Sequence, residues 1–418
     1  MIFYKYKEQE IIDFNAKKPK KIREVIIIKY DKDKDVWIPS PLSHFIYHRH
    51  TANNHSNNTK IQTATSICDF INYLIKSVEL DEDESFRCLK DSGLSALNIF
   101  HLAKYLNHIS NKSNRSLSYE TVKKKELNLI QFYSYLYDRE ITSGKDAEIP
   151  KKVDSYGNLV PASPFKYRGD ITIKYPTKDG TSKVLKDMKE DVWNRFLQYA
   201  YEHYPNIALG VAMQAMGGLR MGEVVNLRMD SINEMREKNY ITVDIEDRQN
   251  DLFNRNINTR KMQVKKPRFN QPVFNFNGRL FEFLDSHIES VLKRTNRVHE
   301  QALFIDSKGQ PMSGDSYMEY FKSLKNDFIE FLYDNGFATT AKELETYTWG
   351  THIGRHIFTN HLLRIDAVSN SEGDPVAKYL MTLRGDSSER SANEYIDTRA
   401  VIEIVTEKIS TISECALL

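Results

Sequence analysis

The chain has 418 residues, of which 40% are hydrophobic and 28% charged, and its 59 basic residues are nearly balanced by 57 acidic ones. This length exceeds the size at which one hydrophobic core usually divides, so we expect two domains. No apolar run reaches the roughly 18 residues that a membrane span needs, and the first residues lack the apolar core of a secretory signal. We therefore expect a cytoplasmic protein without membrane insertion. The three cysteines are too widely spaced for a disulfide framework or a metal cluster.

The first part of the chain is predicted to contain a small β-structure followed by helices. Residues 25–30 and 36–38 are rich in strand-forming residues and flank a polar turn, which predicts a hairpin in an N-terminal appendage, residues 1–41. Apolar residues then recur at helical spacing from about Thr59, from Ala96 to Leu106, and after Ser118, which is suited to cap a helix. Residues 42–142 are therefore expected to form an all-helical domain.

The second part of the chain begins after a stretch in which prolines and glycines interrupt every periodic pattern. We interpret this stretch, residues 143–187, as a linker with short strands such as Ile171–Ile173. In the second domain, residues 188–418, we expect helices around Trp193–Tyr201 and Ile207–Met216 and a strand at Tyr240–Ile245. The fold class is therefore mainly α with small β-sheets or hairpins (α+β). No P-loop or dinucleotide fingerprint is present, so nothing in the sequence supports nucleotide hydrolysis or hydride transfer.

Basic residues gather in three clusters, although the formal net charge is only +2. One cluster lies within residues 17–23, one opens the third predicted helix, and one lies in mid-chain. A single basic cluster is usually a solvated surface, but three of them favour a nucleic-acid partner. The candidate DNA contacts are Lys123, Lys124, Lys125, Arg260, Lys261, Lys266 and Arg268.

Two pairs of residues have the spacing of a phosphate-binding site. His352 and Arg355 are three residues apart on a predicted helix, so both project from one face and can grip adjacent oxygens of one phosphate. Arg220 follows two glycines and precedes a predicted helix, and Glu223 lies on the same face, where its carboxylate can orient the guanidinium. Taken alone, His352 and Arg355 are also explained as ordinary surface residues, and Arg220 and Glu223 as a simple ion pair within a helix.

At these residues the chain resembles the tyrosine recombinase, or phage integrase, family. The resemblance rests on residues 218–223 around Arg220, on the block that starts with His352 and Arg355, and on Gly385, ten residues before Tyr395. It covers about residues 188–410, and the helical region before them is similar to the core-binding domain of the family. The resemblance implies a helical core-binding domain and a catalytic domain that close on DNA as a C-shaped clamp.

The resemblance also implies roles for individual residues. Arg220 and Arg355 correspond to the two catalytic arginines, His352 to the histidine of the second conserved block of the family, and Tyr395 to the nucleophile that forms a 3′-phosphotyrosine. Glu223 and His356 correspond to residues that contact the catalytic side chains and hold them in position. The family uses a lysine on a β-hairpin to protonate the leaving 5′ oxygen, and residues 264–272 are similar to that hairpin. Lys265 is the first choice for this lysine, with Lys266 and Lys261 as alternatives.

One position departs from the family pattern. The family has histidine or tryptophan after the glycine that corresponds to Gly385, whereas this chain has Asp386. A carboxylate beside the scissile phosphate would repel it, and residues 386–389 have the character of a capping box that starts the helix leading to Tyr395. Either Arg384 or His356 is then the alternative donor to the remaining phosphate oxygen.

We therefore expect a site-specific recombinase or integrase that works on double-stranded DNA without metal, ATP or another cofactor, and that is nucleoid-associated when bound. An apolar helical face at residues 401–412 either packs on its own domain or docks on a neighbouring protomer. Docking implies a homotetramer on two DNA sites, with a monomer or dimer in the absence of DNA. The alternatives are a DNA-binding protein that kept the fold and lost catalysis, an enzyme like the type IB topoisomerases or telomere resolvases, and a purely structural helical protein.

Overall fold

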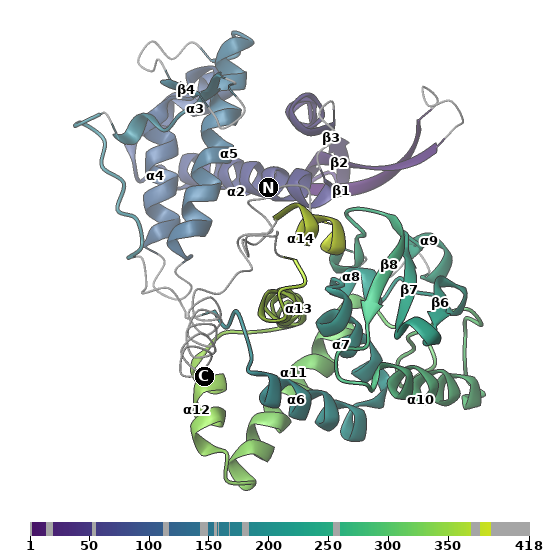
Figure 1. Cartoon of the computed structure of the whole chain (residues 1–418). Coiled ribbons are helices and arrows are strands. Elements are labelled where there is room, and N and C mark those ends of the chain that lie inside the picture. The colour runs from purple at the N-terminus through teal and green to yellow at the C-terminus, as the bar shows by residue number, and fades with distance from the viewer. Residues whose placement is uncertain are drawn as a thin grey trace. The chain divides into compact units, whose positions relative to one another are not determined.

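The computed structural model describes residues 2–13, 20–51, 56–111, 117–142, 149–153, 157, 159–166, 168–177, 184–253, 260–368 and 377–385 (Figure 1). The chain divides into two units, Met1–Thr181 and Ser182–Leu418, each with its own hydrophobic core. Helices dominate the described part of both units, and the sheets found there are small and antiparallel. This arrangement confirms the predicted α+β class.

The first unit opens with a three-stranded sheet in the order β1 (Ile2–Asp13), β2 (Lys20–Asp31) and β3 (Val36–Pro39). The antiparallel pairing of β2 with β3 confirms the predicted hairpin, whereas strand β1 was not predicted. Val25 and Ile27 of β2 are buried in the same core as the helices that follow. A buried ion pair, 3.0 Å between Lys60 Nζ and Glu24 Oε1, also joins the sheet to those helices.

The helices of the first unit confirm the three predicted ones. They are α1 (Ser43–Ile46), α2 (Asn57–Leu80), α3 (Arg87–Ser92), α4 (Ile99–Ser110) and α5 (Tyr119–Asp138), with a π-helical turn at Tyr47–Thr51 and 3₁₀ turns at Glu84–Phe86 and Gly93–Ala96. The predicted cap of α5 is present, because Ser118 Oγ accepts a hydrogen bond from the Thr121 backbone N–H at 3.3 Å. Such a cap satisfies one of the backbone donors that a helix leaves unpaired at its start.

The described part of residues 143–187 contains the paired strands β4 (Lys151–Val153) and β5 (Leu159–Pro161) and a 3₁₀ turn at Pro164–Lys166. The strand predicted at Ile171–Ile173 is wrong. The Asn107 side chain donates to the Thr172 carbonyl at 3.0 Å and accepts from the Lys174 N–H at 2.7 Å, so a side chain takes the place of a neighbouring strand. Ile171 and Ile173 are nevertheless buried in the core of the first unit.

The second unit is a helical assembly around a small sheet. Its elements are α6 (Glu190–His203), α7 (Pro205–Gly217), α8 (Met221–Val224), β6 (Ile232–Met235), β7 (Tyr240–Ile245), α9 (Gln249–Leu252), β8 (Arg268–Phe274), α10 (Leu280–Lys293), α11 (Gly314–Asp334), α12 (Ala338–Thr346), α13 (Ile353–Arg364) and α14 (Ala377–Arg384). Helices α6 and α7 and strand β7 confirm the predicted elements. None of the described helices in either unit has both the length and the apolar character needed to cross a membrane.

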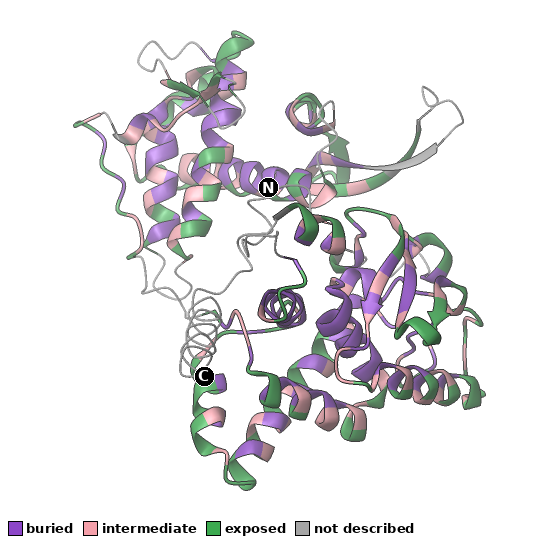
Figure 2. Cartoon of the chain, in the orientation of Figure 1, coloured by how far each residue is buried: buried purple, intermediate pink, exposed green. Residues whose placement is uncertain are grey.

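Helices α7 and α13 form the centre of the second unit. Every residue from Ile353 to Leu363 is buried, and Figure 2 shows α13 in the purple of buried residues. The two helices approach closely at Gly354, where an added Cβ would lie 2.6 Å from the Gln214 side chain. A helix that is buried on all sides holds its side chains firmly, so residues at its start are well placed to carry a site.

Candidate functional site

The turn between α7 and α8 positions Arg220. Helix α7 ends at Gly217 and is capped by Gly218, which has a left-handed conformation with φ +65°. An added Cβ on Gly218 would lie 2.6 Å from the Phe358 ring of α13. Glycine meets both requirements because it accepts positive φ and has no side chain. Arg220 then precedes α8 in an extended conformation. The same turn contacts α13, because the Gly218 carbonyl accepts a hydrogen bond from Arg355.

Glu223 is fully buried and accepts four hydrogen bonds from two arginines. Its carboxylate receives the Arg220 backbone N–H at 2.8 Å and Arg220 Nη1 at 2.9 Å. It also receives Arg268 Nη1 at 2.9 Å and Arg268 Nη2 at 3.2 Å. Burial by itself would raise the pKa of this carboxyl, but the hydrogen bonds and charges of Arg268 and then Arg220 lower it below 4.5. The ionised carboxylate therefore fixes the orientation of Arg220.

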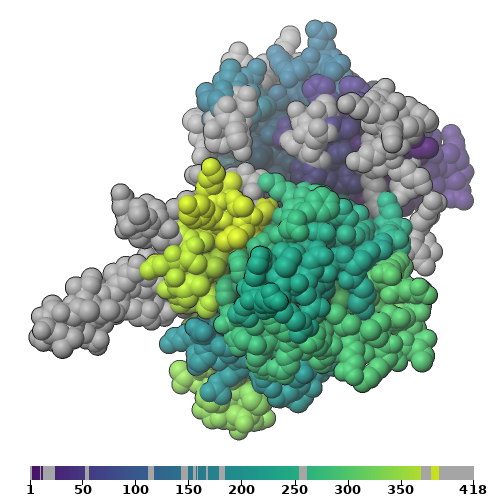
Figure 3. Space-filling model, turned by 45° about the vertical axis from the view of Figure 1, so that its right-hand side comes forward, coloured from purple at the N-terminus to yellow at the C-terminus, as the bar shows by residue number. Residues whose placement is uncertain are grey.

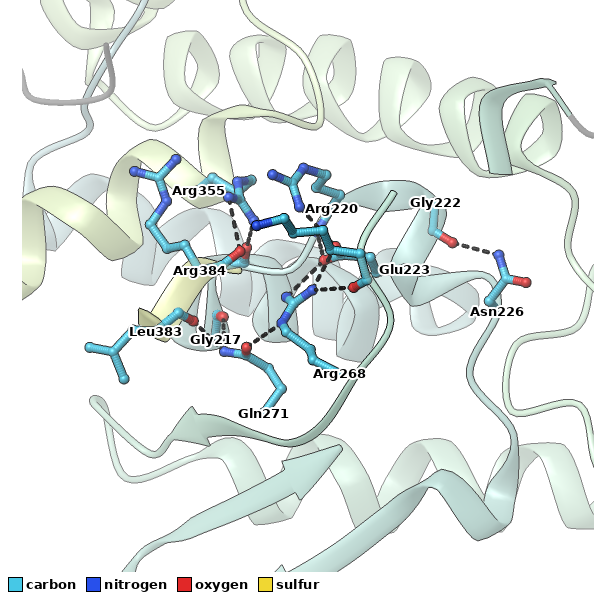
Figure 4. A network of polar contacts seen from close by, with 12 residues as sticks. Gly217, Arg220, Gly222, Glu223, Asn226, Arg268, Gln271, Arg355, Leu383 and Arg384 are labelled. Atoms are coloured by element: carbon cyan, nitrogen blue, oxygen red, sulfur yellow. Dashed lines mark hydrogen bonds and ion pairs between the residues drawn. The ribbon is translucent and has the colours of Figure 1, made fainter. Parts of the chain in front are cut away.

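Strand β8 connects the Arg220 turn to the end of α14 through Arg268 and Gln271. Gln271 Oε1 accepts from Arg268 Nε at 2.6 Å, and Gln271 Nε2 donates to the carbonyls of Gly217 and Leu383 (Figure 4). An added Cβ on Gly385 would lie 2.8 Å from Arg268 Cζ, so Gly385, the residue after α14, lies close to the guanidinium. Figure 3 shows the yellow C-terminal part of the described chain against the green surface of the same unit.

Sequence reasoning missed Gln271 and the inward orientation of Arg268. The sequence holds one signal for Gln271, a polar residue two positions before the fully buried Val273 on a strand, which places both on the inner face. Arg268 was predicted to contact DNA, and the structure places its guanidinium on Glu223 with only 15% of the side chain exposed. Its charge is therefore largely compensated inside the protein.

Helix α13 supplies His352 at its N-cap and Arg355 in its first turn. Arg355 has no exposed surface. Its Nη1 donates to the Gly218 carbonyl, two residues before Arg220, and its Nη2 donates to the Arg384 carbonyl at 3.2 Å. The planar guanidinium thus spans the space between the α7–α8 turn and the end of α14, as Figure 4 shows. His356, the next residue on α13, is also buried.

The imidazole of His352 is the point where positive charge converges. Part of the residue is exposed, yet surrounding protein atoms remove the ring from water enough to lower its pKa from 6.5, and nearby cations lower it further. Four cations act on this ring: Arg355, Arg220, Lys265 and Arg384. They come from four separate segments, so the fold brings together residues that are far apart in the sequence.

The candidate lysines lie just before β8. The hairpin predicted within residues 264–272, all of which the structure describes, is not formed, because β8 is the one strand in this range and its antiparallel partner, β7, ends at Ile245. Lys265 and Lys266 are both exposed, and the charge of Lys265 acts on His352. Lys261 is exposed as well and forms an ion pair with Asp315, 2.7 Å between Nζ and Oδ1. Of these three lysines, Lys265 is the one whose charge contributes to the lowered pKa of His352.

The remaining predicted residues lie elsewhere. Lys123 pairs with Glu126 at 2.9 Å and lies over the Tyr175 ring, and Lys125 pairs with Asp69 at 2.6 Å. Lys124 is exposed on α5. Three predictions fall outside the described residues or side chains: the Arg260 side chain, Asp386 with the capping box that follows it, and Tyr395 with the apolar face at residues 401–412.

Comparison of the sequence with protein-family models and with curated proteins gives no match. Comparison of the structure with solved structures does give matches. The pre-cleavage complex of XerH site-specific recombinase with its difH substrate is 16% identical, with a TM-score of 0.51 over 83% of this chain and 79% of that one. The post-cleavage complex of XerH with a palindromic difH substrate is 17% identical, with a TM-score of 0.52 over 85% and 81%. The chain has the fold of the tyrosine recombinases.

The recombinase fold explains why residues from distant segments meet at His352. Helix α13 and the α7–α8 turn pack against each other in the core, while β8 and α14 close the other sides. The result is a set of rigidly held donors beside a partly exposed histidine. Donors held in this way are suited to bind an anion whose charge grows during a reaction.

Proposed function

We propose that the chain is a DNA breaking-and-rejoining enzyme, a site-specific tyrosine recombinase or integrase that acts on duplex DNA. One observation carries the proposal: the Arg355 guanidinium donates to the Gly218 carbonyl, two residues before Arg220 (Figure 4). Two arginines from distant segments thus lie together near His352, and they lower its pKa along with Lys265. Like charges repel, so their convergence favours the binding of an anion, and a phosphodiester fits planar guanidinium donors. The recombinase fold supports duplex DNA as the source of that phosphodiester.

The reaction follows from charge and from the residues present. The Tyr395 oxygen attacks the phosphorus as its proton passes to water. A phosphotyrosine bond to the 3′ side forms, and the bond to the 5′ oxygen breaks. Negative charge grows on the two non-bridging oxygens, and donors from Arg220, Arg355 and His352 stabilise it. Lys265 transfers a proton to the departing 5′ oxygen. A 5′ hydroxyl from a partner strand reverses these steps, and the energy of the broken bond is kept in the phosphotyrosine.

The burial of Arg355 adds a requirement to this mechanism. A side chain with no exposed surface cannot touch DNA, so binding of DNA must uncover part of the guanidinium. The Gly218 and Arg384 carbonyls accept hydrogen bonds from Nη1 and Nη2, and they can hold the group in place when the binding of DNA uncovers it. Amide hydrogen exchange near the start of α13 should therefore change when DNA binds.

Cleavage is tested with a nicked duplex from which the short 5′ fragment diffuses away, so that the covalent complex accumulates. DNA that flanks the gene is the first substrate, because a mobile element commonly encodes its recombinase near its end. We expect an adduct that survives denaturation with the wild type and none with Tyr395→Phe. Tyr379→Phe is the matched control, because Tyr379 is an exposed tyrosine on α14 and its variant should still form the adduct.

Other outcomes separate the competing functions. Salt-dependent binding without any wild-type adduct would support a DNA-binding protein that has lost catalysis, and an unchanged adduct with Tyr395→Phe would refute the assigned nucleophile. The products distinguish the enzymes, because recombinases yield exchanged strands, topoisomerases relaxed circles and telomere resolvases hairpin ends. A protein that binds no DNA at any salt concentration would be structural.

A further inference from the structure

Arg384, the last residue of α14, is an arginine with no exposed surface. It lies beside an apolar cluster formed by the adjoining parts of α13 and α14, which includes Phe358, Leu362 and Leu380. Burying a guanidinium is unfavourable unless its hydrogen bonds and charge are used, and an apolar side chain would fill the same space. The presence of a buried cation at this position therefore needs an explanation other than packing.

Arg384 and Arg355 hold each other through a closed chain of hydrogen bonds. Arg384 Nη1 donates to Thr359 Oγ1 at 3.0 Å, and Thr359 Oγ1 donates to the Arg355 carbonyl at 2.9 Å. In return, Arg355 Nη2 donates to the Arg384 carbonyl at 3.2 Å. The side chain of each arginine is thus linked to the backbone of the other, and Figure 4 shows the two residues next to each other. This arrangement fixes the Arg355 guanidinium relative to α14.

Arg384 also acts electrostatically on the candidate site, although its side chain has no surface exposed there. Arg384 is one of the cations that act on His352, together with Arg220, Lys265 and Arg355. A charge surrounded by protein is weakly screened, so it contributes to the field at a neighbouring group more strongly than an exposed charge at the same distance. Arg384 therefore adds positive potential behind the exposed donors.

We infer that Arg384 is a positioning residue, which holds the Arg355 guanidinium in its working orientation and adds a fixed positive charge behind the phosphate site. This inference rests on the proposed function for its effect on cleavage. Arg384 is assigned no contact with DNA, because its Nη1 donates to Thr359 in the core rather than towards His352 and its side chain has no exposed surface. Its effect passes through Arg355 and His352.

Two substitutions separate charge from geometry. Arg384→Met keeps a long side chain among apolar neighbours but removes the charge and the hydrogen bond to Thr359. We expect it to fold, to lose about tenfold or more in the single-turnover cleavage rate without weaker DNA binding, and to raise the pKa of His352. Arg384→Lys retains the charge without the planar fork, so the pKa of His352 should stay low while cleavage slows.

The pKa of His352 is measured by NMR on protein with ¹³C-labelled histidine rings, assigned with His352→Gln. Arg236→Met is the matched control, since Arg236 forms exposed ion pairs with Glu234 and Asp285, and its variant should change neither quantity. A folded Arg384→Met variant with the wild-type cleavage rate and wild-type His352 pKa would overturn the inference.

A second variant covers the case in which Arg384→Met does not fold. Thr359→Val removes the bridging hydroxyl and leaves both arginines in place, so we expect slower cleavage with an unchanged His352 pKa. Wild-type cleavage rates in Thr359→Val would refute the positioning role. The titration needs no cleavage activity: if the wild type forms no adduct but loss of the Arg384 charge still raises the His352 pKa, the proposed function fails and the electrostatic part of the inference stands.

Discussion

Arg268 and Glu223, 45 residues apart in the sequence, form a two-point ion pair, 2.9 Å between Nη1 and Oε1 and 3.2 Å between Nη2 and Oε2. The Glu223 side chain is 0% exposed and that of Arg268 is 15% exposed. Because the same carboxylate also holds Arg220, the pair ties strand β8 to the turn that presents Arg220. An interaction that joins two segments in this way supports both the stability of the unit and the geometry of the site.

We expect Arg268→Met to lower the free energy of unfolding of the second unit by about 2 to 4 kcal/mol, because a buried carboxylate loses one of its two cationic partners. The measurement is urea unfolding followed by tryptophan fluorescence in a Trp37→Phe background. The remaining tryptophans, Trp193 and Trp349, are both buried in the second unit and therefore report on it alone.

Two controls define this prediction. A double variant, Arg268→Met with Glu223→Gln, should lose less than the sum of the single variants, because the residues interact directly. Arg236→Met breaks exposed ion pairs in the same unit and should leave its stability unchanged. Equal effects of Arg268→Met and Arg236→Met on the free energy of unfolding would show that the buried ion pair stabilises the unit no more than the exposed ones.

The lowered pKa of Glu223 predicts how stability depends on pH. A carboxyl whose pKa is lower in the folded state than its ordinary value of 4.5 stabilises the folded state above that value, and the stabilisation is lost as the pH falls through the folded-state pKa. Wild type should therefore exceed Glu223→Gln in stability at neutral pH, and the difference should shrink below about pH 4.5. Urea midpoints between neutral and acidic pH measure it, and a constant difference would contradict the assignment.

The role of Lys265 is tested with a substrate in which sulfur replaces the bridging 5′ oxygen. A thiolate leaves without protonation, so a variant that lacks the general acid should recover cleavage on this substrate. We expect Lys265→Ala to be slow on the normal substrate, by about 10²- to 10⁴-fold, and to approach the wild-type rate on the sulfur substrate.

The neighbouring lysines are the controls for this experiment. Lys266→Ala and Lys261→Ala should slow both substrates equally, because lost phosphate contacts do not depend on the leaving atom. Recovery of Lys266→Ala or Lys261→Ala on the sulfur substrate, without recovery of Lys265→Ala, would move the general acid to that lysine.

Lys124 is expected to contact a DNA phosphate, because it is exposed on α5 while Lys123 and Lys125 pair with carboxylates. Removing one phosphate contact should reduce the slope of log K against log salt by about 0.9. Lys124→Gln should show this reduction in fluorescence anisotropy titrations with duplex DNA. Lys293→Gln on α10 is the control with an unchanged slope, and equal slopes for both variants would remove Lys124 from the interface.

The sequence predicts elements well where local chemistry decides them. Ser118 caps α5 as expected, and the β-branched run at Tyr240–Ile245 forms β7 with the expected bounds. Ile171–Ile173 has the same composition but forms no strand, because the Asn107 side chain takes its backbone hydrogen bonds. A contact across 65 residues leaves no trace in the local pattern.

In the candidate site, too, the sequence predicts local contacts but not contacts between distant segments. The spacing of Arg220 and Glu223 predicts their contact, although not its form: Arg220 is the extended residue that precedes α8, and Glu223, the third residue of the helix, reaches back to it. The contacts of Arg268 with Glu223 and of Gln271 with Leu383 depend on how β8 lies beside α14, which no local pattern encodes. The surroundings of Tyr395 lie outside the described residues, so its role stays a prediction.

The ion pair between Glu24 and Lys60 bears on how the protein can be shortened for experiments. Lys60 is 5% exposed, and Glu24 belongs to the N-terminal sheet, so a fragment that starts at residue 42 would retain a buried ammonium group without its counter-charge. The same fragment would expose the apolar surface that Val25 and Ile27 cover. A fragment for the study of the first unit should therefore run from residue 1 to about residue 181, with the sheet treated as part of the helical domain.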